Sequence, residues 1–447
     1  MRRKIYNQLL AWKEQKQGRE AILIDGARRI GKSYIVEEFA RREYRSYILL
    51  DFGNIDADIP ELFDRFLSDL DTFFSRLQLI TGIHLYPRES LIIFDEVQLC
   101  PKARAAIKYL VADGRFDYIE TGSLMSINRN VRDILIPSEE HRIDMHPMDF
   151  EEFLWALGDD MMMDYVRECY AALRPLGRSL HRRLMERLRL YMIIGGMPQA
   201  VEAYALRKDF DEVFGIQQNI LKLYRSDIQK YAERQKEHVT RIFDAIPAQL
   251  QRHEKKFRLA SIEKGARMRS YETAFFWLDE SRVANACYGV TAPEVGLPLM
   301  REDRFKLYMA DTGLLIAMTF PRPEQARLVY QKLLKGKLEL NKGMLMEHLL
   351  AQMLHASGHP LHFYSKSSTV AEERMEIDFL LQKRDITSRH NVIPLEVKSS
   401  TRFTTTSLDK CRRRFAEQIT TPTVLTTTDL ELQGDVLYLP LYMACLL

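Results

Sequence analysis

One run of residues in the chain has the types and spacing needed to bind phosphate: Gly26-Ala27-Arg28-Arg29-Ile30-Gly31-Lys32-Ser33. It follows the pattern G-x-x-x-x-G-K-[ST] and lies between an apolar stretch and a helical one, as its mechanism requires. The glycines let the loop turn back, so that backbone N–H groups and the start of the next helix face phosphate oxygens. We expect Lys32 to reach the β and γ phosphates and the Ser33 hydroxyl to bind Mg²⁺.

Two carboxylates follow an apolar stretch further along the chain. Residues 91–94 have the pattern of a buried strand, and Asp95 and Glu96 come directly after them. This placement suits Asp95 for the Mg²⁺ shell and Glu96 for orienting the attacking water in phosphoryl transfer. The alternative, an ordinary strand that ends in solvated acidic residues, is weakened by the phosphate-binding loop upstream.

Polar groups at the end of the next expected strand, Thr121 and Ser123, are candidates for sensing the γ-phosphate of a bound nucleotide. Three arginines, Arg129, Arg132 and Arg142, could each reach the nucleotide of a neighbouring subunit as an arginine finger. Because a surface arginine is more often simply solvated, none of the three is assigned this role.

A second group, near the C-terminus, has the residue types of metal-dependent phosphodiester hydrolysis. Asp378 lies inside an expected strand. Glu396 and Lys398 lie at the end of another, where period-2 geometry puts them on one face. If the two strands are neighbours, Asp378 and Glu396 can share a divalent cation while Lys398 stabilises the developing charge. The alternative is that Glu396 and Lys398 simply form an ion pair at a strand end.

The stretch 230–270 is basic, with eleven Lys and Arg against five Asp and Glu in a chain whose net charge is only +3. Its helical segments are followed by a short β-like run at 284–290, as in a small winged-helix unit, which favours DNA binding. A solvated helix face is the alternative. The candidate residues for phosphate contacts are Arg252, Lys255, Lys256, Arg258, Lys264, Arg267 and Arg269.

The elements that must position these residues are those of an α/β protein. Between residues 21 and 142, short apolar runs alternate with helical stretches, which predicts a parallel sheet with flanking helices. The expected strands there are 21–25, 47–51, 91–95 and 118–121, and the expected helices 33–42, 61–79 and 103–112. From 148 to about 231 the pattern is helical, with a break at Gly195-Gly196-Met197-Pro198. Beyond 311 we expect a helix at 344–355, strands at 361–364, 377–381 and 393–397, a helix at 407–418 and a strand at 423–427.

The 447 residues suffice for several domains, each with its own core. We expect a nucleotide-binding domain at 1–147, a helical lid-like subdomain at 148–229, a winged-helix-like segment at 230–310 and a C-terminal α/β domain at 311–447.

The composition, 46% hydrophobic and 28% charged, is that of a globular protein. Apolar runs fall short of the roughly 18 residues that span a bilayer, and the basic start lacks a signal-peptide core, so we expect a cytoplasmic protein that does not bind membranes. The five cysteines are far apart, which argues against a disulfide framework and against a zinc site.

The motifs occur in an order that resembles a large group of prokaryotic AAA+ ATPases with a C-terminal domain of unknown function. The resemblance rests on the phosphate-binding loop, 91–96, Thr121-Gly122-Ser123, 147–153, Gly195-Gly196-Met197-Pro198 and Asp311-Thr312-Gly313-Leu314. It implies an N-terminal AAA+ module, a winged-helix segment and a C-terminal domain resembling the PD-(D/E)XK restriction-endonuclease fold, with Glu347, Asp378, Glu396 and Lys398 in its site. The sequence departs from the group at Arg29, often glutamine, at Ser33, often threonine, and at Leu124, often a small polar residue.

Two functions are compatible with these features. The first is a P-loop ATPase that binds ATP and Mg²⁺ and couples hydrolysis to a nuclease-like C-terminal domain acting on DNA, with Asp378, Glu396 and Glu347 as metal ligands. The second is an ATP-controlled switch or assembly protein whose C-terminal domain binds nucleic acid or a protein without cutting. Nucleic acid is the expected partner in both, and a homo-oligomer is left open.

Overall fold

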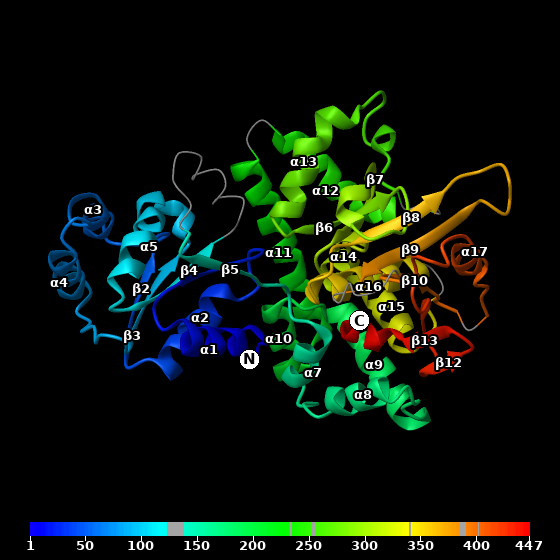
Figure 1. Ribbon diagram of the computed structural model, residues 1–447, viewed down its shortest axis with the longest axis horizontal. Helices are drawn as coiled ribbons and strands as arrows, with labels where there is room; N and C mark the ends of the chain where they lie inside the picture. The colour runs from blue at the N-terminus through cyan, green and yellow to red at the C-terminus, as the bar shows by residue number, and fades with distance from the viewer. Residues whose placement is uncertain (123–137, 233–234, 253–255, 339–340, 384–389, 401) are drawn as a thin grey trace. The chain divides into compact units, whose positions relative to one another are not determined.

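The computed structural model describes residues 1–122, 138–232, 235–252, 256–338, 341–383, 390–400 and 402–447 (Figure 1). Contacts divide the chain into a first unit, Met1–His146 with Glu280–Arg282, and a second unit, Pro147–Asp279 with Val283–Leu447. Each unit has its own β-sheet and hydrophobic core.

A parallel sheet with the strand order β2-β3-β4-β1-β5 lies at the centre of the first unit. The described strands are β1 (Ala21–Asp25), β2 (Ser46–Asp51), β3 (Ser90–Asp95), β4 (Asp117–Gly122) and β5 (Glu140–Asp144). The described helices are α1 (Ile5–Lys16), α2 (Lys32–Glu43), α3 (Asp58–Arg65), α4 (Leu70–Thr81) and α5 (Pro101–Asp113). The predicted strands are all present. The helix expected over 61–79 is instead two helices, because the Asp69 side chain accepts the Thr72 N–H and starts α4.

Helices cover both faces of this sheet. On one face Phe94 of β3 and Leu23 of β1 pack with apolar residues of α3, α4 and α5, among them Phe63, whose ring lies 5.7 Å from that of Phe94. Alternate strand residues such as Ile93 face the other side, where α2, whose Phe39 is buried, packs against β2, β3 and β4. The turn from β1 into α2 is therefore anchored by a buried strand and a buried helix.

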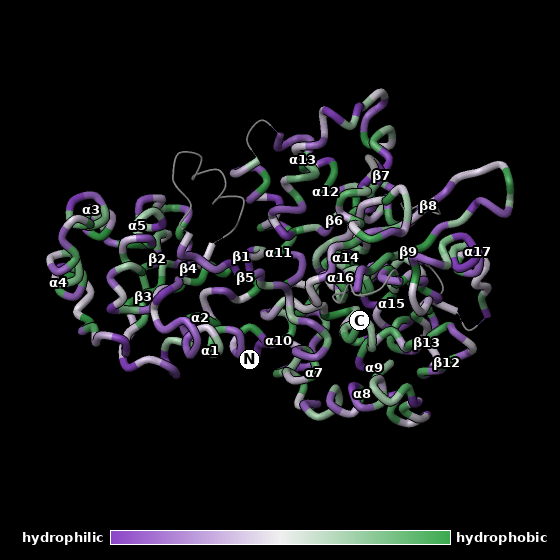
Figure 2. Tube along the Cα trace, in the orientation of Figure 1, coloured by the Kyte–Doolittle hydropathy of each residue, from purple (hydrophilic) through white to green (hydrophobic). Residues whose placement is uncertain are grey.

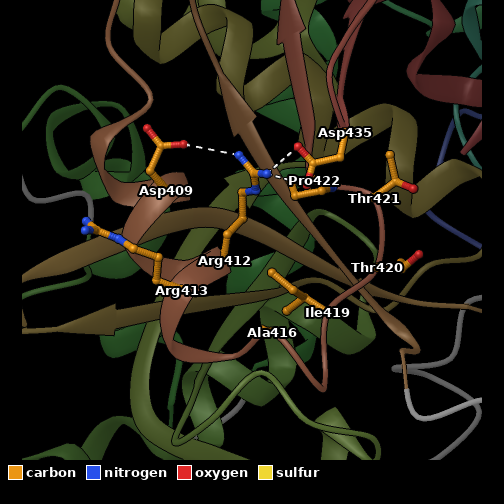
Figure 3. A pocket seen from close by; sticks show the side chains of 9 residues that line it. All are labelled: Asp409, Arg412, Arg413, Ala416, Ile419, Thr420, Thr421, Pro422 and Asp435. Atoms are coloured by element: carbon orange, nitrogen blue, oxygen red, sulfur yellow. Dashed lines mark hydrogen bonds and ion pairs between the residues drawn. The ribbon is translucent and has the colours of Figure 1, made fainter.

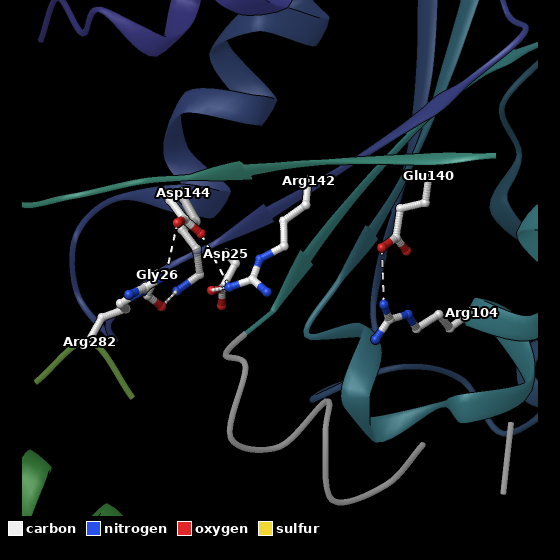
Figure 4. Close-up of polar contacts among 8 residues, drawn as sticks. Asp25, Gly26, Arg104, Glu140, Arg142, Asp144 and Arg282 are labelled. Carbon is white, nitrogen blue, oxygen red and sulfur yellow. Dashed lines mark hydrogen bonds and ion pairs between the residues drawn. The ribbon is translucent and has the colours of Figure 1, made fainter. Parts of the chain in front are cut away.

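The edge strand β5 was not predicted, because its residues Glu-His-Arg-Ile-Asp show no apolar run. It pairs in parallel with β1. Ion pairs rather than apolar contacts hold this strand in place. Arg104 Nη2 donates to Glu140 at 3.0 Å, and Asp144 accepts a hydrogen bond from Arg282 at 2.8 Å (Figure 4). A strand held by charged side chains at a sheet edge gives no periodicity signal.

The second unit begins with helices and continues into a mixed sheet of order β12-β13-β11-β10-β9-β8-β6-β7. The described helices are α7 (Phe150–Ala156), α8 (Met162–Ala171), α9 (Arg178–Ile194), α10 (Pro198–Arg207), α11 (Phe210–Tyr231), α12 (Lys236–Leu250), α13 (Met268–Glu280), α14 (Thr312–Thr319), α15 (Pro323–Leu334), α16 (Lys342–Ala356) and α17 (Thr406–Arg414). The described strands are β6 (Ala284–Val290), β7 (Arg301–Met309), β8 (His362–Lys366), β9 (Met375–Gln382), β10 (Val392–Val397), β11 (Thr423–Thr426), β12 (Glu431–Gln433) and β13 (Val436–Pro440).

The predicted order of helix, three strands, helix and strand is present as α16, β8, β9, β10, α17 and β11. Figure 2 shows the hydrophilic character of α17, in contrast to α16, whose side chains are almost all buried. Strand β6, expected in a winged-helix segment, extends the same sheet, since it pairs with β8 and with β7, a strand that was not predicted. The domain boundaries and the winged-helix assignment stay predictions.

Two of the motifs that carry the resemblance meet at Asp311, which is buried in the second unit. The carboxylate accepts the Gly196 N–H at 2.5 Å and the Leu314 N–H at 3.0 Å, so it caps α14 and holds the break between α9 and α10. A Cβ atom on Gly196 would lie 2.1 Å from the carbonyl oxygen of Met148, which explains the glycine. No helix in the described ranges is long and apolar enough to cross a bilayer.

Candidate functional site: a phosphate-binding loop and a carboxylate cluster

The phosphate-binding loop joins β1 to α2. Gly26 follows Asp25, the last residue of β1, and α2 begins at Lys32. A Cβ atom on Gly26 would lie 2.3 Å from the carbonyl oxygen of Met145, so only glycine fits this turn. Gly31 has a φ of 89°, which side chains disfavour, and leads the chain directly into the helix. The loop thus has the tight turn on which phosphate binding through backbone N–H groups depends.

Lys32 is held against the loop that precedes it. Its ammonium group donates hydrogen bonds to the carbonyl oxygens of Gly26, at 2.8 Å, and Ala27, at 3.0 Å. Burial lowers the pKa of Lys32, and the nearby carboxylates of Glu96 and Asp25 oppose this shift. Because neutral carbonyls compensate an ammonium charge less than carboxylates do, the group is suited to exchange them for phosphate oxygens.

Ser33, Asp95 and Thr121 come together from three different elements. The Ser33 hydroxyl donates to Asp95 Oδ1 at 2.8 Å, and the Thr121 hydroxyl donates to the same oxygen. The two residues predicted to bind Mg²⁺, Ser33 and Asp95, are therefore in direct contact. Their hydroxyl and carboxylate oxygens are ligands that Mg²⁺ accepts in proteins, so they fit this ion. Ser123, the other predicted sensor, lies outside the described residues.

Glu96 has a backbone conformation that is uncommon for residues other than glycine. Its φ of 53° and ψ of 45° are left-handed, and a short 3₁₀ helix, Val97–Leu99, follows it. Its backbone N–H donates to Thr121 Oγ1 at 3.4 Å, and its carboxylate accepts a hydrogen bond from Gln98 Nε2. Strain of this kind costs about 1 kcal/mol or more and is concentrated at functional sites. Gln98 was missed because an amide near a carboxylate forms no recognisable motif.

Arg142, one of the three arginine-finger candidates, is engaged within its own unit. Its guanidinium group donates to Asp25 Oδ2 at 2.7 Å and to Asp144 Oδ1 at 3.2 Å (Figure 4). Burial raises the pKa of Asp25, and the positive charge of Arg142 opposes this rise. The contact therefore stabilises a buried carboxylate next to the loop. Arg129 and Arg132 lie outside the described residues.

Arg3 braces the phosphate-binding loop, a role that the sequence did not reveal. Its buried guanidinium group donates to the carbonyl oxygen of Ile30 at 2.9 Å and to that of His146 at 2.7 Å. Ile30 belongs to the loop, and His146 is the residue with which the first unit's main segment ends. A basic residue near the N-terminus has no positional signal, so only the fold shows what it contacts.

A cavity of about 490 Å³ lies beside the start of α2. Its lining includes Met1 and Arg2 as well as Tyr34 and Ile35, the two residues that follow Ser33. The cavity is thus lined by residues that follow Ser33 in α2, and its walls are apolar, cationic and, at Glu38, acidic.

In the second unit, β9 and β10 are antiparallel neighbours, and their register places Glu396 opposite Asp378. Asp378 Oδ2 accepts the backbone N–H of Val397 at 2.9 Å. Lys398 Nζ lies 2.7 Å from Glu396 Oε2, so the ion pair that we gave as the alternative is present. Burial raises the pKa of Glu396 to about 6, against the opposing charge of Lys398.

Glu347, the third predicted metal ligand, contacts a lysine that the sequence analysis missed. Lys306 Nζ lies 3.2 Å from Glu347 Oε1 and 3.3 Å from Glu376 Oε1. The Tyr308 hydroxyl donates to the same Glu347 oxygen at 2.6 Å. Within the described ranges, no three His, Cys, Asp or Glu side chains are grouped so as to hold a metal ion. These residues therefore do not fit the metal site that the resemblance implies.

Two further surfaces carry positive charge. In the basic stretch Lys256 donates to Ser365 Oγ at 2.7 Å, and Lys255 lies outside the described residues. Of the candidate residues for phosphate contacts, Arg252, Arg258, Lys264, Arg267 and Arg269 are exposed. Near α17 a groove of about 600 Å³ contains Arg412, whose guanidinium group lies between Asp409 and Asp435 (Figure 3). Its charge is compensated by these carboxylates, so the groove is a poor candidate for an anion site.

Comparison with solved structures gives weak resemblances. A Walker-type ATPase of Pyrococcus abyssi is 16% identical, with 71% of this chain and 95% of that chain covered and a TM-score of 0.41. The Orc1 protein of Aeropyrum pernix, solved in complex with DNA, is 12% identical, with coverages of 73% and 94% and a TM-score of 0.28. Neither resemblance is strong enough to carry a functional argument. No curated protein matches the sequence.

Family models match three successive parts of the chain. Residues 185–325 match a domain of unknown function (DUF8612), and residues 342–443 match another (DUF4143). Residues 18–154 match an AAA domain and include β1, the phosphate-binding loop, Asp95 and Glu96. Together with the parallel sheet and the geometry of the loop, this match shows that the chain carries a P-loop ATPase domain of the AAA type.

Proposed function

We propose that the protein hydrolyses Mg-ATP at the loop between β1 and α2. The observation that carries the proposal is the 2.8 Å contact between the Ser33 hydroxyl and Asp95, beside the buried ammonium group of Lys32. Phosphoryl transfer asks a protein mainly to position the reactants and to stabilise charge on the γ-phosphate. Lys32 and the N–H groups of the loop supply that charge stabilisation.

In this proposal Ser33 and Asp95 are the residues that hold Mg²⁺. When bound there, the ion would supply positive charge that offsets the charge of the phosphates. Glu96 orients and polarises the attacking water, and Gln98 fixes its carboxylate through a hydrogen bond. The Thr121 hydroxyl donates to Asp95 and accepts the Glu96 N–H, so it keeps the two acidic residues in a fixed relation.

In this proposal the cavity beside α2 is the candidate site for the nucleoside part of ATP. Tyr34, which is 55% exposed, is one of the side chains that line it. The amino group of Met1 donates to the Tyr34 hydroxyl at 3.2 Å, which limits the movement of that side chain.

The test separates binding from turnover. Glu96→Gln should keep ATP affinity but lose about 100-fold or more in turnover, since an amide polarises water poorly. Lys32→Ala should lose about 100-fold or more in affinity, because the loop loses its cation. Isothermal titration and steady-state phosphate release measure the two quantities, with Glu61→Gln and Lys108→Ala as exposed controls. Unchanged affinity in Lys32→Ala and unchanged turnover in Glu96→Gln would together remove the proposal.

A second candidate function, DNA binding, is favoured by the exposed basic residues of the stretch 230–270. Phosphate contacts release counterions, so log affinity falls with log salt concentration by about 0.9 per contact. Changing Arg252, Lys264 and Arg267 together to alanine should flatten this slope by up to about 3. A triple variant of Lys16, Arg65 and Lys108, also exposed, is the control. An unchanged slope in the first variant would mean that the stretch is only a solvated surface.

Cleavage of the nucleic acid is not part of this proposal. The nuclease role of Asp378, Glu396 and Lys398 stays a prediction from the sequence, as do coupling between the two units and assembly into a homo-oligomer.

A further inference from the structure

We propose that Lys306 is the resident cation of a carboxylate cluster in the second unit and keeps divalent metal ions out of it. The cluster consists of Glu347 on α16 and of Glu376 and Asp378 on β9. The inference concerns a different site from the ATPase site and does not depend on it. It favours a C-terminal domain that binds its partner without metal-dependent cleavage.

The first step is the position of the lysine. The Lys306 side chain is fully buried, and its ammonium group lies 3.2 Å from Glu347 and 3.3 Å from Glu376. Its ammonium group also lies 4.9 Å from the centre of the Phe363 ring. Because the Lys306 side chain is enclosed in this way, its ammonium group cannot move into solvent when another cation approaches the cluster.

The second step is the balance of charge. Burial disfavours the charged ammonium group of Lys306, but the carboxylates of Glu347 and Glu376, at 3.2 Å and 3.3 Å, offset this cost. The ammonium group and the carboxylates therefore stabilise each other. Glu347 is itself buried, and a buried carboxylate without a cation would be strongly destabilising.

The third step is the geometry that a metal ion needs. Carboxylate oxygens must approach a divalent cation to about 2.0–2.6 Å. Glu347 Oε1 already accepts hydrogen bonds from Lys306 and from the Tyr308 hydroxyl. An ion bound to this oxygen would lie a few ångströms from a fixed ammonium group, where like charges repel strongly because little water screens them.

The fourth step concerns the remaining predicted ligands. Glu396 is 2% exposed and its carboxylate contacts Lys398. One oxygen of Asp378 accepts the N–H of Val397 and so helps to hold β10 beside β9. Lys306 thus contacts Glu347 and Glu376, and Lys398 contacts Glu396. The predicted metal ligands therefore stabilise the sheet and its neighbouring helix.

The proposal is tested by titrating Mn²⁺ in the absence of nucleotide. Every protein in the test carries Asp95→Asn, which removes a predicted metal ligand of the ATPase site. With Lys306 present, we expect no Mn²⁺ site that depends on Asp378. Adding Lys306→Gln should create one, at least about tenfold tighter than any binding to the parent, because a repelling charge has gone. Glu347→Gln should then weaken it again, and Lys306→Arg, which keeps the charge, should not create it.

Two results would overturn the proposal. One is a Mn²⁺ site in the protein that retains Lys306, if Asp378→Asn abolishes it. The other is a Lys306→Gln protein that circular dichroism shows to be folded but that gains no site, since the lysine would then not be what excludes the metal. If Lys306→Gln does not fold, the titration of the protein that retains Lys306 decides alone.

Discussion

Lys32 and Lys306 are both buried, yet the two units use the charge of a lysine in opposite ways. Lys32 donates to the loop carbonyls of Gly26 and Ala27, whereas Lys306 contacts carboxylates. Burial prevails at Lys32 and lowers its pKa. At Lys306 burial acts in the same direction, but carboxylates outweigh it and the pKa is raised.

This difference teaches what makes a buried cation available to a ligand. A lysine whose hydrogen-bond partners are neutral keeps a charge that is only partly compensated, and an anionic phosphate that replaces those partners is stabilised by it. A lysine whose partners are buried carboxylates is already neutralised, and removing it leaves those carboxylates unpaired. A buried lysine is thus part of a proposed ligand site in the first unit, whereas in the second unit it stabilises buried carboxylates.

The largest expected effect is on stability and comes from substituting the two lysines. Lys306→Met should lower the free energy of unfolding by about 3–5 kcal/mol, because buried carboxylates lose their cation. Lys32→Met should lower it by clearly less, since a desolvated charge disappears together with two carbonyl contacts and the attraction to Glu96 and Asp25. Urea denaturation followed by circular dichroism measures both variants. Equal losses of stability in the two would break the comparison.

A smaller effect is expected from Arg3, which holds the loop rather than the phosphate. Arg3→Ala should weaken ATP binding by about tenfold, because the Ile30 carbonyl loses a donor and the loop is less well ordered before binding. Arg19→Ala, at an exposed position in the same unit, is the matched control. Isothermal titration measures the affinities, and Arg3→Lys should recover part of the loss. Wild-type affinity in folded Arg3→Ala protein would show that the brace is not needed.

Much of the first unit's site could be predicted from the sequence, because its groups follow one another along the chain at fixed spacing. The strand 21–25, the loop and Lys32 form one continuous motif, and Asp95 ends an apolar strand that periodicity identifies. Arg3 and Gln98 could not be found in this way. Their partners are fixed by tertiary structure, and neither belongs to a pattern of spacing.

In the second unit, the residue that decides the chemistry of the candidate site could not be predicted from the sequence. Strand patterns located β9 and β10, but their pairing, which brings Asp378 close to Glu396, was only a condition of the sequence analysis and is shown by the structure. Lys306 lies on β7, which was not predicted, and it reaches Glu347 across 41 positions of sequence. A spacing motif therefore found the carboxylates but not the cation that neutralises them, and the expected chemistry depends on that cation.

Asp311 gives the smallest effect and tests the second unit at another buried charge. Burial raises its pKa to about 6, although the N–H groups of Gly196 and Leu314 favour the charged form. The unfolded chain releases this proton near pH 4, so folding takes up a proton between about pH 4 and pH 6. The contribution of Asp311 to stability therefore falls as the pH rises through this window and is constant above it.

Asp311→Asn cannot titrate, so the comparison with wild type isolates this contribution. From about pH 5 to about pH 7.5, the unfolding free energy of wild type should fall relative to the variant by about 1 kcal/mol. Urea denaturation at the two pH values measures the difference, and Asp211→Asn, at an exposed aspartate of the same unit, is the control. A difference that does not change with pH would mean that Asp311 is already ionised at pH 5, and that its hydrogen bonds to the two motifs outweigh its burial.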